Sequence, residues 1–323
     1  MKILIITSEW PTEDHPEWVP FLKDQVDDLR RLGLQVDVFN FRGNSNPFKY
    51  LLTWIKFQFM DKKSYDIFHA HWGQNGLICF PSKKPVVVTY HGSDLQGIVK
   101  PDGHYDQFRS FVLRIASKIS ARLSSRIILV SGNMQNHLPK VKNKTDIIPC
   151  GIDLEKFTPI EKSKARQMLK WPLDKKFVLF PANPEFTVKR FQLATEVVEW
   201  IRNDFNVELI TLSSIPHDLV PYYMNASDVL LMTSKHEGSP MVIKEALACN
   251  LPIVSVNVGD VKERISSIPG CEICDTDYPD EISEKLKLVL ERGLRIDGRS
   301  KILDLSRKEI AKKIVKIYQD MIN

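Results

Sequence analysis

The stretch KILIITSEWPTEDHPEWVPFLKDQVDDLRRLGLQVDVFN, residues 2–40, decides the fold class. It begins and ends with short apolar runs, at 2–7 and 35–40, and each run predicts a buried strand. Between them, apolar residues recur at helical spacing and stop at Gly33, a typical helix end; they are Phe21, Leu22, Val26, Leu29 and Leu32. Strand, helix and strand in this order are typical of a parallel α/β sheet.

The same alternation continues along the chain and restarts after its middle. Strands are predicted at 66–71, 85–90, 126–131, 177–182, 207–212, 228–233 and 252–257, with helices near 190–203, 240–249, 280–293 and 306–322. The segment FTPIEKSKARQML at 157–169 is polar and shows no strand pattern. We therefore expect two doubly wound α/β domains, at 1–160 and 161–305, and a terminal segment at 306–323 that can pack back on the first domain.

Composition narrows the function classes. The 323 residues are 43% hydrophobic and 26% charged, as in ordinary globular proteins, and the net charge of +5 is mild for a nucleic-acid-binding protein but suits anionic ligands. Five scattered cysteines do not suggest a disulfide framework and favour the reducing cytoplasm. No apolar run is long enough to span a membrane, and no predicted strand is followed by G-x-G-x-x-G, which argues against a nicotinamide or flavin enzyme.

The segment SKHEGSPMVIKEA at 234–246 carries the clearest sign of a ligand site, because it joins a predicted strand to a helix. Ser239 is expected to cap that helix, and Pro240 to occupy its first position. The unpaired N–H groups of Met241 and Val242 could then hold a diphosphate without a metal, and Gly238 would let the backbone approach it closely.

Two carboxylates flank this helix start. Glu237 lies on the loop and Glu245 one to two turns inside the helix, so one could face a sugar and the other a ribose. An ordinary capped helix with two solvated glutamates explains the same spacing, so the spacing alone is weak.

The surrounding residues make the comparison specific. SKHEGSPMVIKEALACNLPIVS resembles the E-x7-E signature of the retaining glycosyltransferases of family four, which share the two-domain GT-B fold with a central cleft. The resemblance extends to RIILVSGNM at 126–134, IIPCGIDLEKFTP at 147–159, YYMNASDVLLMTS at 222–234 and GDVKERI at 259–265. It implies retaining, metal-independent hexosyl transfer from a UDP- or GDP-sugar to a glycan or lipid-linked acceptor, in cell-surface polysaccharide or glycolipid synthesis.

The resemblance also implies roles for individual residues. Glu237 would contact the donor sugar and Glu245 the ribose, while the backbone of 238–242 would bind phosphates and sugar. Lys189, in FTVKRF, matches the lysine that binds the diphosphate. The family's Gly-Arg pair is replaced by PANP at 181–184, and Arg190 is the substitute cation we expect.

The acceptor side is predicted from the first domain. His91, in HGSD, follows a predicted strand, and the resemblance places it beside the reacting sugar; a plain turn histidine before Gly92 is the alternative. His71 ends another predicted strand and is assigned to the acceptor. The loop after the first strand lacks the family's glycines, and its Trp18 either shapes the acceptor pocket or simply packs.

Three patterns could hold a metal, and we predict no metal at any of them. His69 and His71 point the same way on a strand, but further ligands are not evident. Cys271-x2-Cys274 is only half a zinc site. Asp275 and Asp277 precede Pro279 and are interpreted as capping and first-turn residues of a helix.

Two alternatives to a transferase stay open: a GT-B epimerase or phosphorylase, and a non-catalytic sugar-binding or partner subunit. Segments 51–63 and 108–126 combine apolar and basic residues at helical spacing. They are interpreted as helices packed on a sheet, with peripheral contact at the inner membrane face as the second reading.

Overall fold

The computed structural model describes residues 1–13, 15, 18–43, 46–100 and 103–322. The chain forms two compact units. Unit 1 comprises Met1–Lys100, Tyr105–Gly151 and the segment from Arg307 onward, and unit 2 is chiefly Ile152–Ser306. The N-terminal loop's residues Asp14, Pro16 and Glu17 lie outside the described part of the chain.

Unit 1 is built on a parallel sheet of order β2-β1-β3-β4-β5-β6. Its strands are β1 (Lys2–Thr7), β2 (Gln35–Asn40), β3 (Ile67–His71), β4 (Val86–Tyr90), β5 (Arg126–Leu129) and β6 (Thr145–Ile147). Its helices are α1 (Pro20–Arg31), α2 (Pro47–Phe59), α3 (Gly73–Gly76), η1 (Leu77–Cys79), α4 (Ser93–Gln96), α5 (Gln107–Leu123), η2 (Gly132–His137), η3 (Pro139–Lys144) and α12 (Arg307–Ile322).

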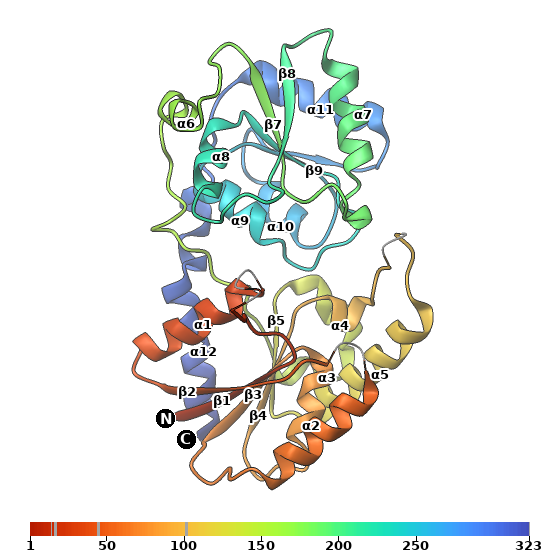
Figure 1. The fold of residues 1–323 in the computed structure, drawn as a ribbon, viewed down its shortest axis with the longest axis vertical. Helices are drawn as coiled ribbons and strands as arrows, with labels where there is room; N and C mark the ends of the chain where they lie inside the picture. The colour runs from red at the N-terminus through yellow and green to blue at the C-terminus, as the bar shows by residue number, and fades with distance from the viewer. Residues whose placement is uncertain (14, 16–17, 44–45, 101–102, 323) are drawn as a thin grey trace. The chain divides into compact units, whose positions relative to one another are not determined.

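Two helix layers cover this sheet (Figure 1). Helices α1 and α12 lie on one face, and α2, α3 and α5 lie on the other. The C-terminal α12 is tied to α1 by Arg307, whose guanidinium binds the Asp28 carboxylate through Nε at 2.8 Å. Ile314 and Tyr318 of α12 are buried, so the last helix completes the core of the first unit.

Unit 2 repeats the design with a parallel sheet of order β11-β10-β9-β7-β8. Its strands are β7 (Lys176–Phe180), β8 (Val207–Thr211), β9 (Val229–Met232), β10 (Ile253–Val256) and β11 (Glu272–Cys274). Its helices are α6 (Lys162–Leu169), η4 (Thr187–Lys189), α7 (Phe191–Ile201), α8 (Val220–Ala226), α9 (Met241–Ala248), α10 (Val261–Ile265), α11 (Pro279–Arg292) and η5 (Arg299–Leu305).

Both sheets have the same doubly wound order when each is counted from its own first strand. The direction of winding reverses between β1 and β3 in unit 1, and between β7 and β9 in unit 2. Ligands of open α/β sheets bind beyond the carboxyl ends of the strands at such a reversal. The fold therefore directs attention to the segments after β1, β3, β7 and β9.

The predicted α/β architecture is confirmed, with differences at the short elements. Strands β6 and β11 have only three residues each and were not predicted, because so short a run carries little periodicity. The predictions that Ser239 caps the helix and that Pro240 is its first residue are each wrong by one position. Pro240 is the N-cap of α9, and the helix begins at Met241.

Candidate functional site

Three histidines gather at the carboxyl ends of β3 and β4 in unit 1. His69 and His71 alternate with outward neighbours on β3, so both rings lie on the face covered by α1 and α12, with their centroids 4.5 Å apart. His91 follows β4, and its Nε2 lies 3.0 Å from Nδ1 of His71. The structure thus brings together the two histidines that were predicted on separate grounds.

Neighbouring groups set the proton positions in this cluster. The amide nitrogen of Gln25 lies 3.4 Å from Nε2 of His71, and an amide nitrogen can only donate. Nδ1 of His71 must then carry its proton and donate it to Nε2 of His91. His91 consequently holds its own proton on Nδ1, where it is a hydrogen-bond donor suited to a hydroxyl or an oxyanion.

Burial keeps these imidazoles neutral. It lowers the pKa of His69 to about 3 and that of His91 to about 3, and it holds the pKa of His71 well below its usual range. His69 is further fixed by the hydroxyls of Tyr318, 2.5 Å from Nδ1, and Thr89, 2.7 Å from Nε2. The cluster is a set of oriented donors and acceptors rather than a positive charge.

Asp94 orders the turn that carries His91, and the sequence analysis missed it. Its carboxylate accepts from the backbone N–H groups of Gly73 at 3.0 Å, Gly92 at 3.0 Å and His91 at 3.3 Å. Burial raises the pKa of Asp94 to about 6, although these hydrogen bonds oppose the rise. Its position three residues after a strand-end histidine is the signal that could have identified it.

A different tryptophan from the one predicted lies beside His91. The ring of Trp72 is 4.8 Å from that of His91, and Phe21 of α1 lies 5.1 Å from it. Trp18 instead stacks on His15 at 4.3 Å, with the guanidinium of Arg42 3.5 Å above its ring. These are packing contacts, and the acceptor role of Trp18 stays a prediction.

Lys189 and Glu237 meet in unit 2. Lys189 ends the short turn η4 after β7, and Glu237 lies on the loop after β9; Nζ and Oε1 are 2.5 Å apart. Both side chains are partly buried. The loops are held together by backbone as well, because Lys235 N–H donates to the Val188 carbonyl at 2.9 Å and the Thr233 hydroxyl donates to the Lys189 carbonyl at 2.8 Å.

The start of α9 lies directly beyond Glu237. Met241 and Val242 are its first two residues, and both are partly exposed. Ser239 does not cap the helix, because its hydroxyl donates to Asp260 at 2.8 Å. Gly259 has φ of +56° and packs so tightly on this loop that a Cβ there would come within 2.8 Å of the Gly238 carbonyl oxygen. Contacts with Asp260 and Gly259 thus fix the loop before the helix, and no side chain caps the start of α9.

Glu245 and Arg190 border the same region. Glu245 lies one turn inside α9, with His217 Nε2 3.9 Å from its Oε1. Arg190 was expected to bind a diphosphate, yet its guanidinium is held by protein: Nε donates to the Thr233 carbonyl at 2.5 Å and Nη1 pairs with Asp277 at 2.6 Å. Its part in diphosphate binding stays a prediction.

The interpretation of Asp275 and Asp277 as capping residues is wrong. Tyr278 is the N-cap of α11, and neither aspartate lies in its first turn. The reason is that Glu281 reaches back from the helix and accepts from the N–H groups of Asp275 and Thr276, both at 2.8 Å, while Asp277 pairs with Arg190. Within the described residues, no three His, Cys, Asp or Glu side chains are grouped to hold a metal ion.

Comparison with protein families gives two matches. Residues 2–156 match the model described as Glycosyltransferase Family 4, and residues 200–302 match the one described as Glycosyl transferases group 1. The first range contains the histidine cluster, and the second contains Glu237, Glu245 and the start of α9.

Comparison with individual proteins points the same way. A protein of Bacillus subtilis named for teichuronic acid biosynthesis, the glycosyltransferase TuaC, is 25% identical over 81% of this chain and 82% of its own. The N,N'-diacetylbacillosaminyl-diphospho-undecaprenol alpha-1,3-N-acetylgalactosaminyltransferase of Campylobacter jejuni is 25% identical over 91% and 88%.

Solved structures share the fold at lower identity. The sucrose-phosphate synthase of Thermosynechococcus elongatus superposes with a TM-score of 0.76 at 16% identity, covering 99% of both chains. Anabaena HepE in complex with UDP gives a TM-score of 0.69 at 17% identity, covering 99% of this chain and 100% of its own. The described part of the present chain contains no helix long and apolar enough to cross a membrane.

Proposed function

This chain is a GT-B glycosyltransferase that belongs with family four, and from that premise we propose that it transfers a hexose, with retention, from a UDP- or GDP-sugar to an acceptor hydroxyl. The observation that carries the proposal is the Lys189–Glu237 pair beside the start of α9. A cation, a carboxylate and unpaired N–H groups at one place match the diphosphate and sugar of such a donor. The UDP bound by HepE supports the same ligand class.

The proposed reaction needs no protein nucleophile. The acceptor oxygen bonds to the anomeric carbon as the bond from that carbon to the diphosphate breaks, and the acceptor proton passes to the departing phosphate. Lys189 and the N–H groups of Met241 and Val242 stabilise the charge that grows on the diphosphate. Glu237 lies against the donor sugar and Glu245 holds the ribose. The backbone of Gly238 and Ser239 approaches the phosphates and the sugar closely.

Unit 1 supplies the acceptor side in this proposal. His91, oriented by His71 and Asp94, donates from Nδ1 to the reacting sugar or its acceptor. The relatives named for teichuronic acid and for a diphospho-undecaprenol acceptor suggest a glycan or lipid-linked acceptor. Polysaccharide or glycolipid synthesis in the cytoplasm is the setting we propose, and the five free cysteines suit a reducing compartment.

A thermal-shift screen of nucleotide sugars tests the donor. A ligand at 100 times its dissociation constant stabilises the protein by about 2.7 kcal/mol, which is readily measured. We expect UDP or GDP and one of their sugars to raise the melting temperature, with or without EDTA. Transfer to a lipid-diphosphate acceptor should also survive EDTA. The absence of a shift with every nucleotide sugar would contradict the proposal.

The same assay separates the alternatives. An epimerase would interconvert the donor sugar when no acceptor is present, and a non-catalytic subunit would bind the donor without turnover. Loss of transfer in EDTA, restored by magnesium or manganese, would contradict metal independence.

A further inference from the structure

Helix α5 has its small residues inside and its large ones outside. Its buried residues are Ser110, Ser117, Ser120 and Ala121. Ser117 and Ser120 pack against α3 so closely that a side chain at Gly73 or Gly76 would collide with them. Its outward stripe, at helical spacing, is Phe108, Phe111, Val112, Ile115, Ile119 and Leu123. Phe108 is 77% exposed and Phe111 is 61% exposed, so the sheet does not explain why this helix is apolar.

Helix α2 repeats the arrangement next to it. Both helices pack against η1, on the same side of the sheet (Figure 1). The exposed stripe of α2 is Phe48, Leu51, Leu52, Ile55 and Phe59, and the side chain of Phe59 is 89% exposed. We call the two stripes together the α2–α5 face. So many large apolar side chains in water, gathered on one side of one unit, mark a surface that binds something.

Positive charge predominates around this face, although Arg109 pairs with Asp106 and Arg126 pairs with Asp146. Residues 107–144 contain no aspartate or glutamate but eight basic residues: Arg109, Arg114, Lys118, Arg122, Arg126, Lys140, Lys142 and Lys144. Helix α2 likewise carries Lys49 and Lys56 and no acid. A second copy of this chain docked through the same face would place these cations against each other, which disfavours a homodimer.

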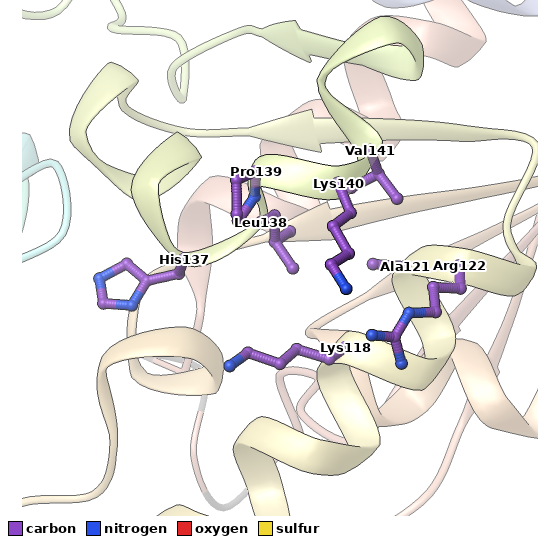
Figure 2. A pocket seen from close by; sticks show the side chains of 8 residues that line it. All are labelled: Lys118, Ala121, Arg122, His137, Leu138, Pro139, Lys140 and Val141. Atoms are coloured by element: carbon purple, nitrogen blue, oxygen red, sulfur yellow. The ribbon is translucent and has the colours of Figure 1, made fainter.

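A basic cavity opens where α5 meets η2 and η3. It has a volume of about 130 Å³ and is lined by Lys118, Arg122, His137 and Lys140 together with four apolar or proline residues. Figure 2 shows the Arg122 and Lys140 head groups directed toward the same space, with the Lys118 side chain extended below them. Burial lowers the pKa of His137, and the positive charges of Arg114 and Lys118 lower it further.

We propose that the α2–α5 face docks on an anionic lipid bilayer, with its phenylalanine and leucine side chains among the acyl chains and a lipid phosphate in the cavity formed by Lys118, Arg122 and Lys140. An apolar stripe bordered by cations is the combination that binds an anionic membrane surface. The helices do pack on the sheet with basic residues in water, as predicted, but large apolar side chains of both helices face water as well. The docking is independent of the proposed donor chemistry and would hold the enzyme at lipid-linked acceptors.

Co-sedimentation of the full chain with vesicles tests the proposal. The vesicles are phosphatidylcholine alone, or phosphatidylcholine and phosphatidylglycerol in a two-to-one ratio. We expect binding to the anionic vesicles only, weakened by salt. The double variant Arg122→Gln with Lys140→Gln, and separately Phe59→Ser with Phe111→Ser, should each lower the partition coefficient about tenfold.

Matched variants in unit 2 serve as controls. Lys164→Gln with Lys301→Gln removes two exposed charges, and Leu173→Ser with Leu294→Ser removes two exposed apolar side chains; both should bind vesicles like the parent chain. Donor-induced thermal shifts in solution should be unchanged in every variant, so failure of docking and failure of the donor proposal are distinguishable.

Several outcomes would overturn the docking proposal. These are equal binding to neutral vesicles, no vesicle binding, unchanged binding in both face variants, or binding of inorganic phosphate in the cavity without any vesicle binding. A dimer that Phe59→Ser with Phe111→Ser converts to a monomer would show that a second copy covers the face.

Discussion

Lys189 is the residue from which the donor proposal is most directly tested. In the structure its ammonium is paired with Glu237, so a bound diphosphate would share or replace this partner. A charge-assisted hydrogen bond contributes about 1.5–3 kcal/mol, so Lys189→Ala should weaken binding of the nucleoside diphosphate about ten- to hundredfold. Calorimetric titration measures it. Lys164→Ala, at an exposed position on α6, is the control, and equal affinity in the two variants would show that Lys189 is only a surface ion-pair residue.

Substitution of each of the two glutamates should change a different kinetic constant. Glu237 is placed beside the sugar, whose anomeric carbon becomes positive in the transition state, so Glu237→Gln should chiefly lower kcat. Glu245 is placed beside the ribose, which does not change charge, so Glu245→Gln should chiefly raise the KM for the donor. Steady-state kinetics at saturating acceptor, after circular dichroism has verified folding, measures both. If both variants keep the kcat and KM of the parent chain, the segment is an ordinary helix with two solvated glutamates.

At the scale of elements, the loop before α9 depends on a glycine that follows β10. Gly259→Ala would strain a left-handed backbone and press on the carbonyl oxygens of Gly238 and Glu237. We expect it to displace Glu237, and so to lower donor affinity and kcat.

The variant Gly33→Ala separates backbone strain from pressure on the loop. Gly33 has φ of +87° with nothing within 4 Å of the added Cβ, so this variant carries only the backbone strain, about 1–2 kcal/mol. It should lose stability but keep its kinetics. If Gly259→Ala behaves in the same way, the loop does not depend on that contact.

At the scale of the whole molecule, the histidine cluster makes unit 1 sensitive to acid. His69 and His91 have a pKa of about 3 when folded and about 6.5 when unfolded, so the unfolded chain takes up more protons between these values. Stability is then lost as the pH falls through this window, by up to about 1.4 kcal/mol per unit for each histidine. Asp94, whose pKa is raised to about 6, acts in the opposite direction but is a single group.

Melting curves at pH 7 and pH 4.5 measure this effect. We expect the melting temperature to fall on acidification. In the His69→Asn variant it should fall less, because one group with a lowered pKa has been removed. The control variant His15→Asn changes an exposed position in the N-terminal loop, and its melting temperature should fall as much as that of the parent chain. A melting temperature that does not change between these two pH values would contradict the neutral, buried cluster.

Some parts of the candidate site could be predicted from the sequence and others could not. Glu237, Glu245 and the start of α9 are close together in the chain, so local pattern was sufficient to predict that they adjoin. The Lys189–Glu237 pair spans 48 residues and the His71–His91 pair spans 20, and no local pattern encodes either distance. Arg190 and Asp277 were assigned separate roles although they bind each other across 87 residues.

Sequence by itself determined the two α/β units and their parallel strands, because apolar periodicity and helix stops act over a few neighbouring residues. It also predicted the family, through the resemblance of one strand, loop and helix to those of family four. Only the tertiary structure decided that α12 completes unit 1, that Asp94 orders the His91 turn, and that α2 and α5 turn their apolar stripes to water. Periodicity shows that a helix has an apolar face, but which way that face points depends on what the rest of the chain packs against it, and α3 accepts only the small residues of α5.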